Sequence, residues 1–287
     1  MTIRSISSGR TQRPDRARRP LDNVGVQYGK LALDSGQITA DQFLDLNERI
    51  GGYDTDGKVV PTRSVADPEA VRLAYETGRI NTGGGSLGSI PIIDVRNYRD
   101  PWGDVHDRVR SFSMRARLVA ANGHADNHVI LTLPNGRHQL APGSPASAGY
   151  HFQLNRSLRL MSQWLDNIEG DRSPGSPPLK AVRNKPPALS DACWSHEGHK
   201  IVEQQRYYGG QCHPLYPNHG DPRMAAGAPL ASDILKCRLK PVDPNDYSPP
   251  LTPEQLARLK VIFPKGLCDY SHPGIHQRKV QKTWQKY

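Results

Sequence analysis

The chain has 287 residues, enough for one large domain or a domain with an appendage. A hydrophobic content of only 36%, with 26 Gly and 25 Pro, indicates a core diluted by long irregular segments. No apolar run reaches the roughly 18 residues needed to span a membrane, and residues 1–20 lack the hydrophobic stretch of a secretory signal. The formal net charge of +10 lies mostly in two tails, residues 1–20 and 278–287, so it does not predict a nucleic-acid-binding face.

The N-terminal third is expected to be a basic tail followed by helices. Residues 1–20 are polar, rich in Arg and without periodicity, which predicts disorder. In residues 21–88, one helix is predicted to begin at Thr39, where Gln42 three positions later completes a capping box. A second helix is predicted to begin at Asp67, before Pro68, and to end at Gly78.

Strands and helices alternate in residues 89–169. Residues 90–98 ("IPIIDVRNY") form a near-continuous apolar run led by β-branched residues, which predicts a strand buried in a parallel sheet. A helix ending near Gly123 follows, then a strand at 128–133 ("HVILTL") and a helix at 153–168. This alternation is typical of an α/β fold.

Residues 170–287 are predicted to be a Pro-rich, irregular extension with one helix at 252–263. It contains all four cysteines, Cys193, Cys212, Cys237 and Cys268, and none of them forms C-x-x-C, so zinc-ribbon spacing is absent. An even count in a loop-rich segment favours two disulfides, and hence an oxidising compartment, over four free thiols. If they pair, Cys193–Cys212 and Cys237–Cys268 is the sequential choice among three connectivities.

Candidate catalytic residues follow the two predicted strands. Asp100 and Asp104 come after the first strand, and His138 comes after the second. Because the carboxyl ends of parallel strands share one edge of a sheet, an acid after one strand and a histidine after the next can form a pair in which the carboxylate orients the imidazole as a general base. Asp104 is the competing acid, and it could instead cap the following helix.

From Ser89 to Ile168 the sequence resembles the α/β-hydrolase superfamily. The resemblance rests on "IPIIDVRNYRDP", on "HVILTLPNGRH" and on the amphipathic helix "LNRSLRLMSQWLDNI". It implies that Asp100 is the triad acid and His138 the triad base. It also implies an α/β fold class, namely the C-terminal part of a hydrolase-like parallel sheet, with a cap-like helical segment at 21–88 and the irregular Cys-containing extension.

A second resemblance spans residues 21–275. Segments such as "DNVGVQYG", "FLDLNERIGGYD" and "FPKGLCDYSHPG" look like the C-terminal half of a bacterial family of unknown function. Members of that family are large, exported, α/β-hydrolase-like proteins without a settled substrate. The resemblance implies a parent protein in the periplasm or outside the cell.

No convincing nucleophile is found. Gly84–Gly88 ("GGSLG") spells G-x-S-x-G, but Ser86 follows a polar, Gly-rich segment and directly precedes a strand. A nucleophile elbow needs a buried strand before the serine and a helix after it. The chain is therefore expected to be the C-terminal fragment of a longer enzyme.

Further polar residues cluster without a complete set of metal ligands. They are Asp54, Asp56 and Gly57 in a partial calcium loop, then Asp104, His106 and Asp107, and finally His213, His219 and Asp221. Each cluster is better explained as a turn or as surface residues than as a metal site, so no metal and no cofactor is expected.

The predicted function is that of a C-terminal fragment of a serine hydrolase acting on small-molecule or oligomeric carboxylic esters. The alternative is a non-catalytic truncated product or pseudo-enzyme that serves as a binding or packing module. No nucleic-acid or membrane partner is expected, and the oligomeric state is left open.

Overall fold

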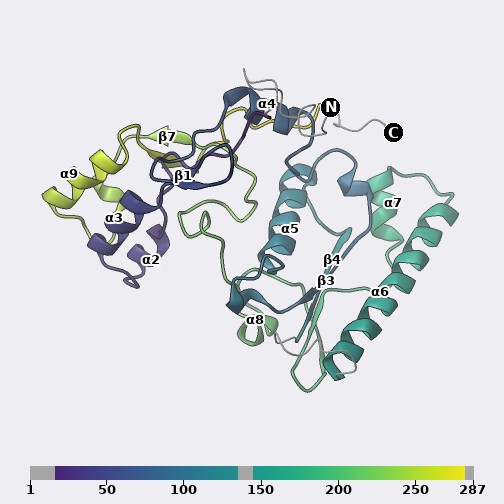
Figure 1. The fold of residues 1–287 in the computed structure, drawn as a ribbon. Coiled ribbons are helices and arrows are strands. Elements are labelled where there is room, and N and C mark those ends of the chain that lie inside the picture. The colour runs from purple at the N-terminus through teal and green to yellow at the C-terminus, as the bar shows by residue number, and fades with distance from the viewer. Residues whose placement is uncertain (1–16, 135–144, 282–287) are drawn as a thin grey trace. The chain divides into compact units, whose positions relative to one another are not determined.

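The computed structural model describes residues 17–134 and 145–281 (Figure 1). The chain forms two compact units, one from residues 1–82 with 220–287 and one from residues 83–219. This division differs from the expected segments. Residues 170–219, expected to be part of an extension, belong to the sheet-containing unit, and the rest of that extension packs with the N-terminal helices.

The unit formed by residues 83–219 is built on a four-stranded sheet. Its strands are β3 (Ile92–Asn97), β4 (His128–Leu133), β5 (Ala192–Trp194) and β6 (Lys200–Val202), in the order β3-β4-β5-β6. The first three run parallel, and β6 is antiparallel to β5. The expected α/β class with a mostly parallel sheet is confirmed.

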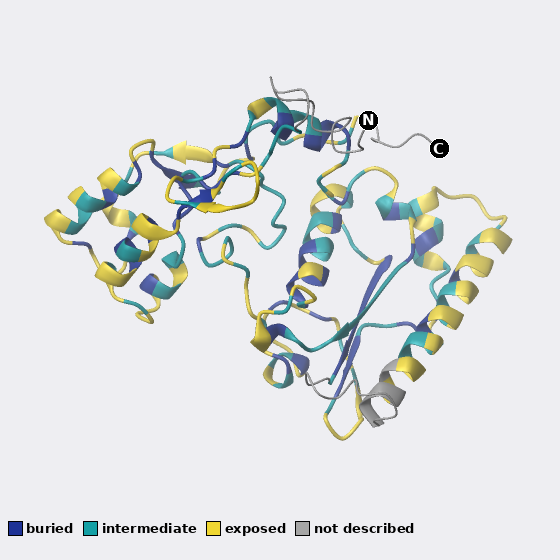
Figure 2. Cartoon of the chain, in the orientation of Figure 1, coloured by how far each residue is buried: buried dark blue, intermediate teal, exposed yellow. Residues whose placement is uncertain are grey.

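Strands β3 and β4 differ in burial, although their lengths and register match. Every residue of β4 is buried, as is typical of a central parallel strand, whereas every residue of β3 is only half-buried (Figure 2). Within the described residues β3 is the edge of the sheet and pairs with β4 alone. The prediction that β3 is buried was therefore wrong, because an edge strand lacks a neighbour on one side.

Helices cover both faces of this sheet. They are α5 (Val109–Asn122), α6 (Pro145–Gly170), α7 (Pro177–Arg183) and the short α8 (Cys212–Leu215), with 3-10 helices η1 (Leu87–Ser89) and η2 (Asp100–Trp102). On one face, Trp164 of α6 is fully buried in an apolar cluster with Val129 and Leu131 of β4. Its indole Nε1 donates a hydrogen bond to the carbonyl of Ala181 (2.7 Å), so α6 and α7 are joined as well.

The face of the sheet toward α5 is unusually polar. Alternation along β3 and β4 directs Asp94, Arg96, His128 and Thr132 to the side opposite the Trp164 cluster. Arg96 Nε donates to the hydroxyl of Ser111 in α5 (2.8 Å), which shows that this layer lies between sheet and helix. Hydrogen bonds and ion pairs therefore replace much of the apolar packing expected there.

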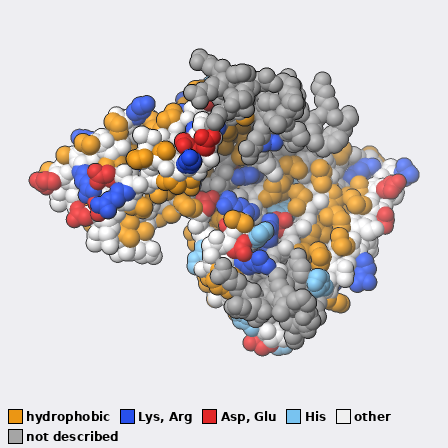
Figure 3. All heavy atoms as spheres, in the orientation of Figure 1, with side chains coloured by type: hydrophobic (Ala, Val, Ile, Leu, Met, Phe, Trp, Pro, Cys, Tyr) orange, Lys and Arg blue, Asp and Glu red, His pale blue; other side chains and the backbone are white. Residues whose placement is uncertain are grey.

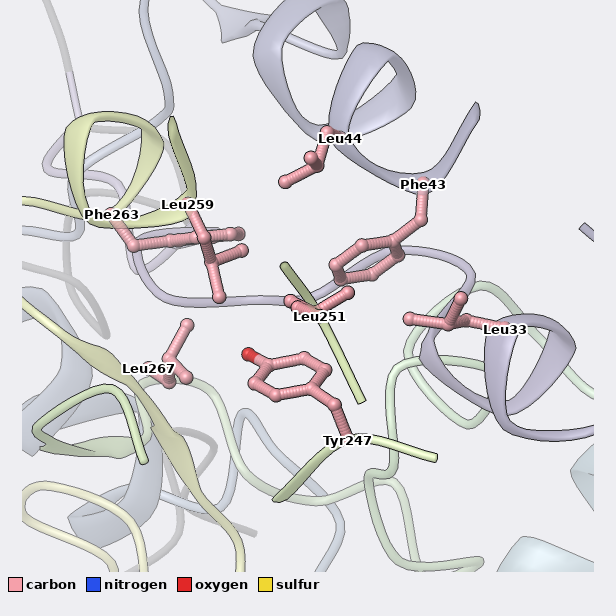
Figure 4. Close-up of a cluster of buried hydrophobic side chains, with 8 residues drawn as sticks. All are labelled: Leu33, Phe43, Leu44, Tyr247, Leu251, Leu259, Phe263 and Leu267. Carbon is pink, nitrogen blue, oxygen red and sulfur yellow. The ribbon is translucent and has the colours of Figure 1, made fainter. Parts of the chain in front are cut away.

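The other unit combines helices with two small antiparallel sheets. Its elements are α2 (Lys30–Asp34), α3 (Ala40–Arg49), β1 (Gly52–Tyr53), β2 (Val59–Val60), α4 (Pro68–Glu76), β7 (Arg238–Lys240), η3 (Pro244–Asp246), α9 (Pro253–Ile262) and β8 (Leu267–Asp269). Pairs β1–β2 and β7–β8 are antiparallel. Its main core joins α3 to α9, with Phe43 and Leu44 facing Leu259 and Phe263 (Figure 4).

The sequence signals for helix starts are confirmed in this unit. Thr39 and Gln42 form the predicted capping box of α3, and Thr252 with Gln255 forms an equivalent box at α9. Asp67 caps α4 by accepting the backbone N–H of Ala70 (3.0 Å). Each cap satisfies backbone donors that a helix start leaves unpaired.

Charged side chains of both signs lie over α3 and α9 (Figure 3). Arg258 of α9 pairs with Asp45 (2.6 Å) and with Glu48, both on α3. These contacts lie at the rim of the Phe43–Leu259 core, so charge pairing and apolar packing act on the same pair of helices.

Disorder was predicted for residues 1–20, of which residues 1–16 lie outside the described residues, and residues 17–20 are held by contacts with the rest of the unit. Arg18 forms an ion pair with Asp67 (2.9 Å), and the carbonyl of Arg19 accepts the backbone N–H of Asp67 (3.0 Å). Arg19 also donates to the carbonyl of Tyr53 (3.0 Å). Residues 17–20 are therefore docked on the unit, held by an acidic helix cap that local polarity gave no reason to expect.

Both disulfides are present in the predicted sequential pairing. Cys193–Cys212 links β5 to α8, and Cys237–Cys268 links the segment before β7 to β8. Each unit thus has one covalent cross-link, and no cysteine is free.

Candidate functional site

Asp100 lies at the carboxyl end of β3, where it begins the 3-10 helix η2. Its side chain is fully buried. Oδ1 accepts the backbone N–H of Arg108 (3.0 Å), the residue immediately before α5. Oδ2 is buried and has no hydrogen-bond partner in the described part of the chain. Asp100 therefore has one oxygen fixed by the backbone and one left over.

The nearest cation is the buried guanidinium of Arg108, whose Nε lies 3.6 Å from Asp100 Oδ2. Arg108 Nη2 donates to Asn218 Oδ1 (2.6 Å) and to the carbonyl of Tyr216, and Nη1 lies 3.5 Å from Thr132 Oγ1. Burial lowers the pKa of Arg108, and the charge of Asp100 opposes that shift. Arg108 thus compensates the Asp100 charge while most of its own bonds go to other groups.

Aromatic rings enclose Asp100 and Arg108. We use the name Asp100 site for the group formed by Tyr98, Asp100, Arg108, Thr132 and Tyr216. The guanidinium lies 5.1 Å from the ring centre of Tyr98 and 5.7 Å from that of Tyr216. Burial raises the pKa of Tyr98 and raises that of Tyr216 to about 12, so both phenols stay neutral at physiological pH. The surroundings are low in dielectric constant, which strengthens the interaction of Asp100 with any donor that reaches it.

The Cys193–Cys212 disulfide packs against the tyrosines of the Asp100 site. Both cysteines are buried in one cluster with Tyr216, and Tyr98 packs against that cluster. Tyr216 follows α8 directly, so the cross-link positions the segment whose carbonyl accepts from Arg108. This connection between a cysteine pair and the predicted acid was not visible in the sequence.

Asp104 occupies a different environment from Asp100. Its side chain is partly exposed, and it accepts hydrogen bonds from the backbone N–H of His106 (2.9 Å), from His106 Nδ1 (2.7 Å) and from Arg99 (3.2 Å). The hydrogen bonds from His106 lower the pKa of Asp104 to about 2. Asp104 is thus committed to its own loop and does not cap α5.

His138 lies outside the described residues, five positions after β4 ends at Leu133. The ends of the two strands are adjacent, since the backbone N–H of Tyr98 donates to the carbonyl of Leu133 (3.0 Å). Asp100 and the segment that contains His138 thus leave the same edge of the sheet from neighbouring strands.

Ser86 lacks the structural context of a nucleophile. It is exposed, follows Gly85 in a left-handed conformation, and precedes the three-residue helix η1. No strand leads into it, because the described element before η1 is helix α4. Ser86 therefore does not lie in a nucleophile elbow, as its sequence context predicts.

Comparison with known proteins identifies a family. A family model described as a tannase-like family of unknown function (DUF6351) matches residues 4–279, nearly the whole chain. The chain belongs to this family. No curated protein and no solved structure matches it. The expected membership in a family of unknown function is confirmed.

In this family member, a second acid–histidine pair lies inside the polar layer below α5. His128 Nε2 is 3.0 Å from Asp94 Oδ2, and Arg96 lies 3.8 Å from the other oxygen. Burial raises the pKa of Asp94, but the hydrogen bond and charge of His128 outweigh it and hold the pKa below its usual value. The His128 side chain is fully buried, which favours a structural role for the pair. Sequence reasoning missed it, although a polar residue in each apolar strand was the available signal.

A serine, a histidine and an aspartate also meet just after β8. Ser271 Oγ lies 3.0 Å from His272 Nδ1, and Asp269 Oδ2 lies 2.9 Å from that same nitrogen. In a catalytic triad the serine and the acid contact opposite ring nitrogens. The cluster is a turn in which the Ser271 hydroxyl bonds to Asp269 and lowers the pKa of that carboxyl to about 2.

A polar cavity of about 380 Å³ lies at the opposite end of the sheet, where β4 and β5 begin. Its charged groups already have partners. Arg115 pairs with Asp191, and Lys185 Nζ donates to the carbonyl of Asp126 (2.8 Å). Arg115 Nε, like Asp100 Oδ2, is buried without a hydrogen-bond partner in the described part of the chain, but the other two nitrogens of Arg115 hold both oxygens of Asp191.

No group of three or more His, Cys, Asp or Glu residues is placed to hold a metal ion in residues 17–134 and 145–281. The partial calcium loop is a turn in which Asp54 Oδ1 accepts the backbone N–H groups of Asp56 and Lys58. Of the described helices, none is long and apolar enough to cross a membrane.

Proposed function

We propose that this protein is a carboxylic ester hydrolase component whose residues 83–219 supply the acid and the base of a serine-hydrolase triad. Asp100 is the orienting acid and His138 the general base. The observation that carries the proposal is the buried Oδ2 of Asp100 at the carboxyl end of β3, which accepts no hydrogen bond from the described residues and has Arg108 Nε 3.6 Å away. The family description as tannase-like supports the reaction class, since tannases are carboxylesterases.

The two oxygens of Asp100 match the division of labour that a triad acid requires. Oδ1 is held by the Arg108 backbone N–H, which fixes the carboxylate plane. Oδ2 is then available for the Nδ1–H of an imidazole, which is the bond that selects the tautomer of a catalytic histidine. Five residues span up to about 17 Å, so His138 has the reach to arrive from Leu133.

The nucleophile and the oxyanion donors are proposed to come from chain outside the described residues. The edge of β3 that has no strand partner among the described residues supports this, because further strands of a larger sheet would pair at such an edge. The chain is on this proposal the C-terminal part of a longer enzyme.

The acid and base assignment can be tested by NMR on this chain alone. The imidazole of His138 is titrated in the wild type, in Asp100→Asn and in Asp104→Asn, with histidine side chains labelled. We expect Asp100→Asn to lower the pKa of His138, because a nearby carboxylate favours the protonated imidazole. Asp104→Asn is the matched control, since it removes a carboxylate from the same loop.

The opposite pattern would reject the assignment. If Asp104→Asn lowers the pKa of His138 and Asp100→Asn does not, Asp104 is the acid. If neither variant changes it, the paired acid and base do not exist in this chain, and the non-catalytic binding module becomes the better interpretation.

A nitrophenyl ester assay tests where the nucleophile lies. We expect this chain to show only background hydrolysis, with no change in Ser86→Ala. Turnover that His138→Ala abolishes and Ser86→Ala leaves intact would place a nucleophile within residues 1–287 and contradict the proposed division of the site.

Two disulfides support a location in an oxidising compartment, such as the periplasm or the extracellular medium. Trapping of free thiols with a maleimide during expression measures this directly. Protein isolated with four reactive thiols would argue for a reducing compartment instead.

A further inference from the structure

The unit that contains α3 and α9 has a largely apolar cavity of about 540 Å³. Its walls include Val24, Pro61, Val65, Ile262, Phe263 and Pro264. This volume lies within the range of small-molecule sites, which are mostly apolar with a few polar groups that orient the ligand. Nothing in the proposed triad uses this cavity.

Arg63 brings a positive charge into this apolar site. Its Nη1 donates to the carbonyls of Asn23 (3.0 Å) and Val26 (2.9 Å), and its Nη2 donates to the carbonyl (2.8 Å) and Oδ1 (3.2 Å) of Asn47. Its guanidinium also lies 4.7 Å from the ring centre of Phe263. Each of its hydrogen-bond acceptors is neutral.

The charge of Arg63 has no carboxylate partner in residues 17–134 and 145–281. Burial lowers the pKa of Arg63, as expected for a cation removed from water without an anion beside it. The four acceptors occupy the N–H groups of the two terminal nitrogens, so the Nε–H remains for a ligand. Charges in such surroundings are normally paired, which makes an incoming anion the missing partner.

The charges at the rim of the cavity add to this preference. Glu48 lines it and forms an ion pair with Arg258, which also pairs with Asp45. Lys265 also lines it and is exposed, and no ion pair of Lys265 occurs among the described residues. Among the charged side chains that line the cavity, the cations Arg63 and Lys265 therefore outnumber the single acid Glu48.

One wall of the cavity is rigid. Gly25 and Gly266 line it with positive φ, and a side chain on Gly25 would collide with Leu239. The carbonyl of Gly25 accepts the backbone N–H of Cys268 (2.9 Å), and Cys268 is cross-linked to Cys237. A preformed wall lowers the ordering cost of binding a small molecule.

We propose that this cavity binds a small organic carboxylate, with the carboxylate at Arg63 Nε–H and Lys265 and a compact apolar body against Phe263 and Val65. The site is distinct from the proposed triad, and the inference does not depend on that function. It predicts that charge and an apolar body are both needed for binding.

The test compares 1-naphthoate with the neutral 1-naphthalenemethanol by titration calorimetry on the full chain. We expect naphthoate to bind about tenfold or more tightly, as a charge-assisted hydrogen bond gives. Lys265→Gln should reduce the ratio of the two affinities, because it removes one of the two cations proposed to contact the carboxylate. Arg63 also donates hydrogen bonds to three backbone carbonyls, so Arg63→Gln would destabilise the fold. The role of positive charge in binding is therefore tested with the Lys265 variant.

Two valines provide a matched pair for the location of the site. Val65 lines the cavity and is 58% exposed, whereas Val59 lies nearby in β2, is 73% exposed and does not line it. We expect Val65→Trp to weaken binding of both probes about tenfold or more by filling the cavity, and Val59→Trp to leave it unchanged. Equal affinities for the two probes, no binding of naphthoate at millimolar concentration, or full binding in Val65→Trp would each overturn the proposal.

Discussion

The guanidinium of Arg115 holds both carboxylate oxygens of Asp191. Arg115 Nη2 donates to Oδ1 (3.0 Å) and Nη1 pairs with Oδ2, while the backbone N–H groups of Ile130 and Gln205 donate to the same two oxygens (2.8 Å each). Arg115 also donates to the carbonyl of His128 (2.8 Å). One carboxylate thus joins α5, β4 and the chain on either side of β5 and β6.

Breaking this contact should strongly destabilise the unit formed by residues 83–219. We expect Arg115→Leu to lower the free energy of unfolding by about 3 kcal/mol, because a largely buried carboxylate loses its cation. Urea denaturation followed by tryptophan fluorescence measures this, since Trp164 and Trp194 lie in the unit. Arg49→Leu is the control, as its pair with Asp45 is exposed and should matter by less than about 0.5 kcal/mol. Equal effects of the two changes would contradict the structural role of Arg115.

The Asp94–His128 pair predicts a pH-dependent contribution to stability. His128, Arg96 and Ser111 hold the pKa of Asp94 below its usual 3.8, so the carboxylate stabilises the fold above pH 3.8, and this contribution is lost as pH falls through the folded pKa. We expect Asp94→Asn to cost about 1 kcal/mol at pH 7. The difference from wild type should shrink below pH 3.8, as measured by urea denaturation at each pH. Asp166→Asn, on the exposed face of α6, should show no such dependence, and a constant difference for Asp94→Asn would reject the mechanism.

The two disulfides should contribute unequally. Cys193–Cys212 closes a loop with a sequence separation of 19 and Cys237–Cys268 one with a separation of 31. Chain-entropy estimates give about 3.2 kcal/mol for the first and about 3.7 kcal/mol for the second, a difference of about 0.4 kcal/mol. Paired Cys→Ala variants compared by calorimetry test this, with dithiothreitol-treated wild type as reference. Variants as stable as the wild type would show that neither cross-link forms.

Glycines in the β1–β2 hairpin region should respond differently to a side chain. Gly51 has φ +58, and a Cβ there would overlap the carbonyl oxygen of Val60, whereas Gly57 has φ +80 with open space around it. We expect Gly57→Ala to cost about 1 kcal/mol, from backbone conformation alone. Gly51→Ala should cost about 2–4 kcal/mol, because the collision adds to that strain. Thermal unfolding of both variants decides it, and the reverse order would mean that the hairpin relaxes around residue 51.

Local patterns predicted much of this fold. Strand β4 was predicted over its observed range, and the predicted strand at 90–98 contains β3. The caps at Thr39 and Asp67 were also correct, because each depends on residues within four positions of one another. Strand β5 and strand β6 were missed, since segments of three residues are too short to show a period of two.

The contacts between segments that are far apart in the chain could not be predicted from local sequence patterns. Phe43 and Leu259 meet across more than two hundred residues, and nothing local to α3 or α9 indicates that partner. The division of the chain into interleaved units follows from such contacts, which is why contiguous segments were expected instead.

For the candidate site, sequence reasoning favoured Asp100 and kept Asp104 as the alternative acid. Burial distinguishes them, since Asp100 is enclosed by Arg108 and the tyrosines whereas Asp104 faces its own loop. Arg108 itself was missed, because a single arginine before a helix carries no signal until Asn218 and Tyr216 arrive from more than a hundred residues away.

The polar layer between α5 and the sheet also affects how the protein responds to temperature. Unfolding that exposes apolar surface raises the heat capacity, whereas exposure of polar groups such as Arg96, His128 and Thr132 lowers it. Residues 83–219 should therefore unfold with a smaller heat-capacity increment per residue than a unit with an apolar interior of the same size. A smaller heat-capacity increment flattens the curve of stability against temperature. The free energy of unfolding of this unit should therefore change little over a wide range of temperature.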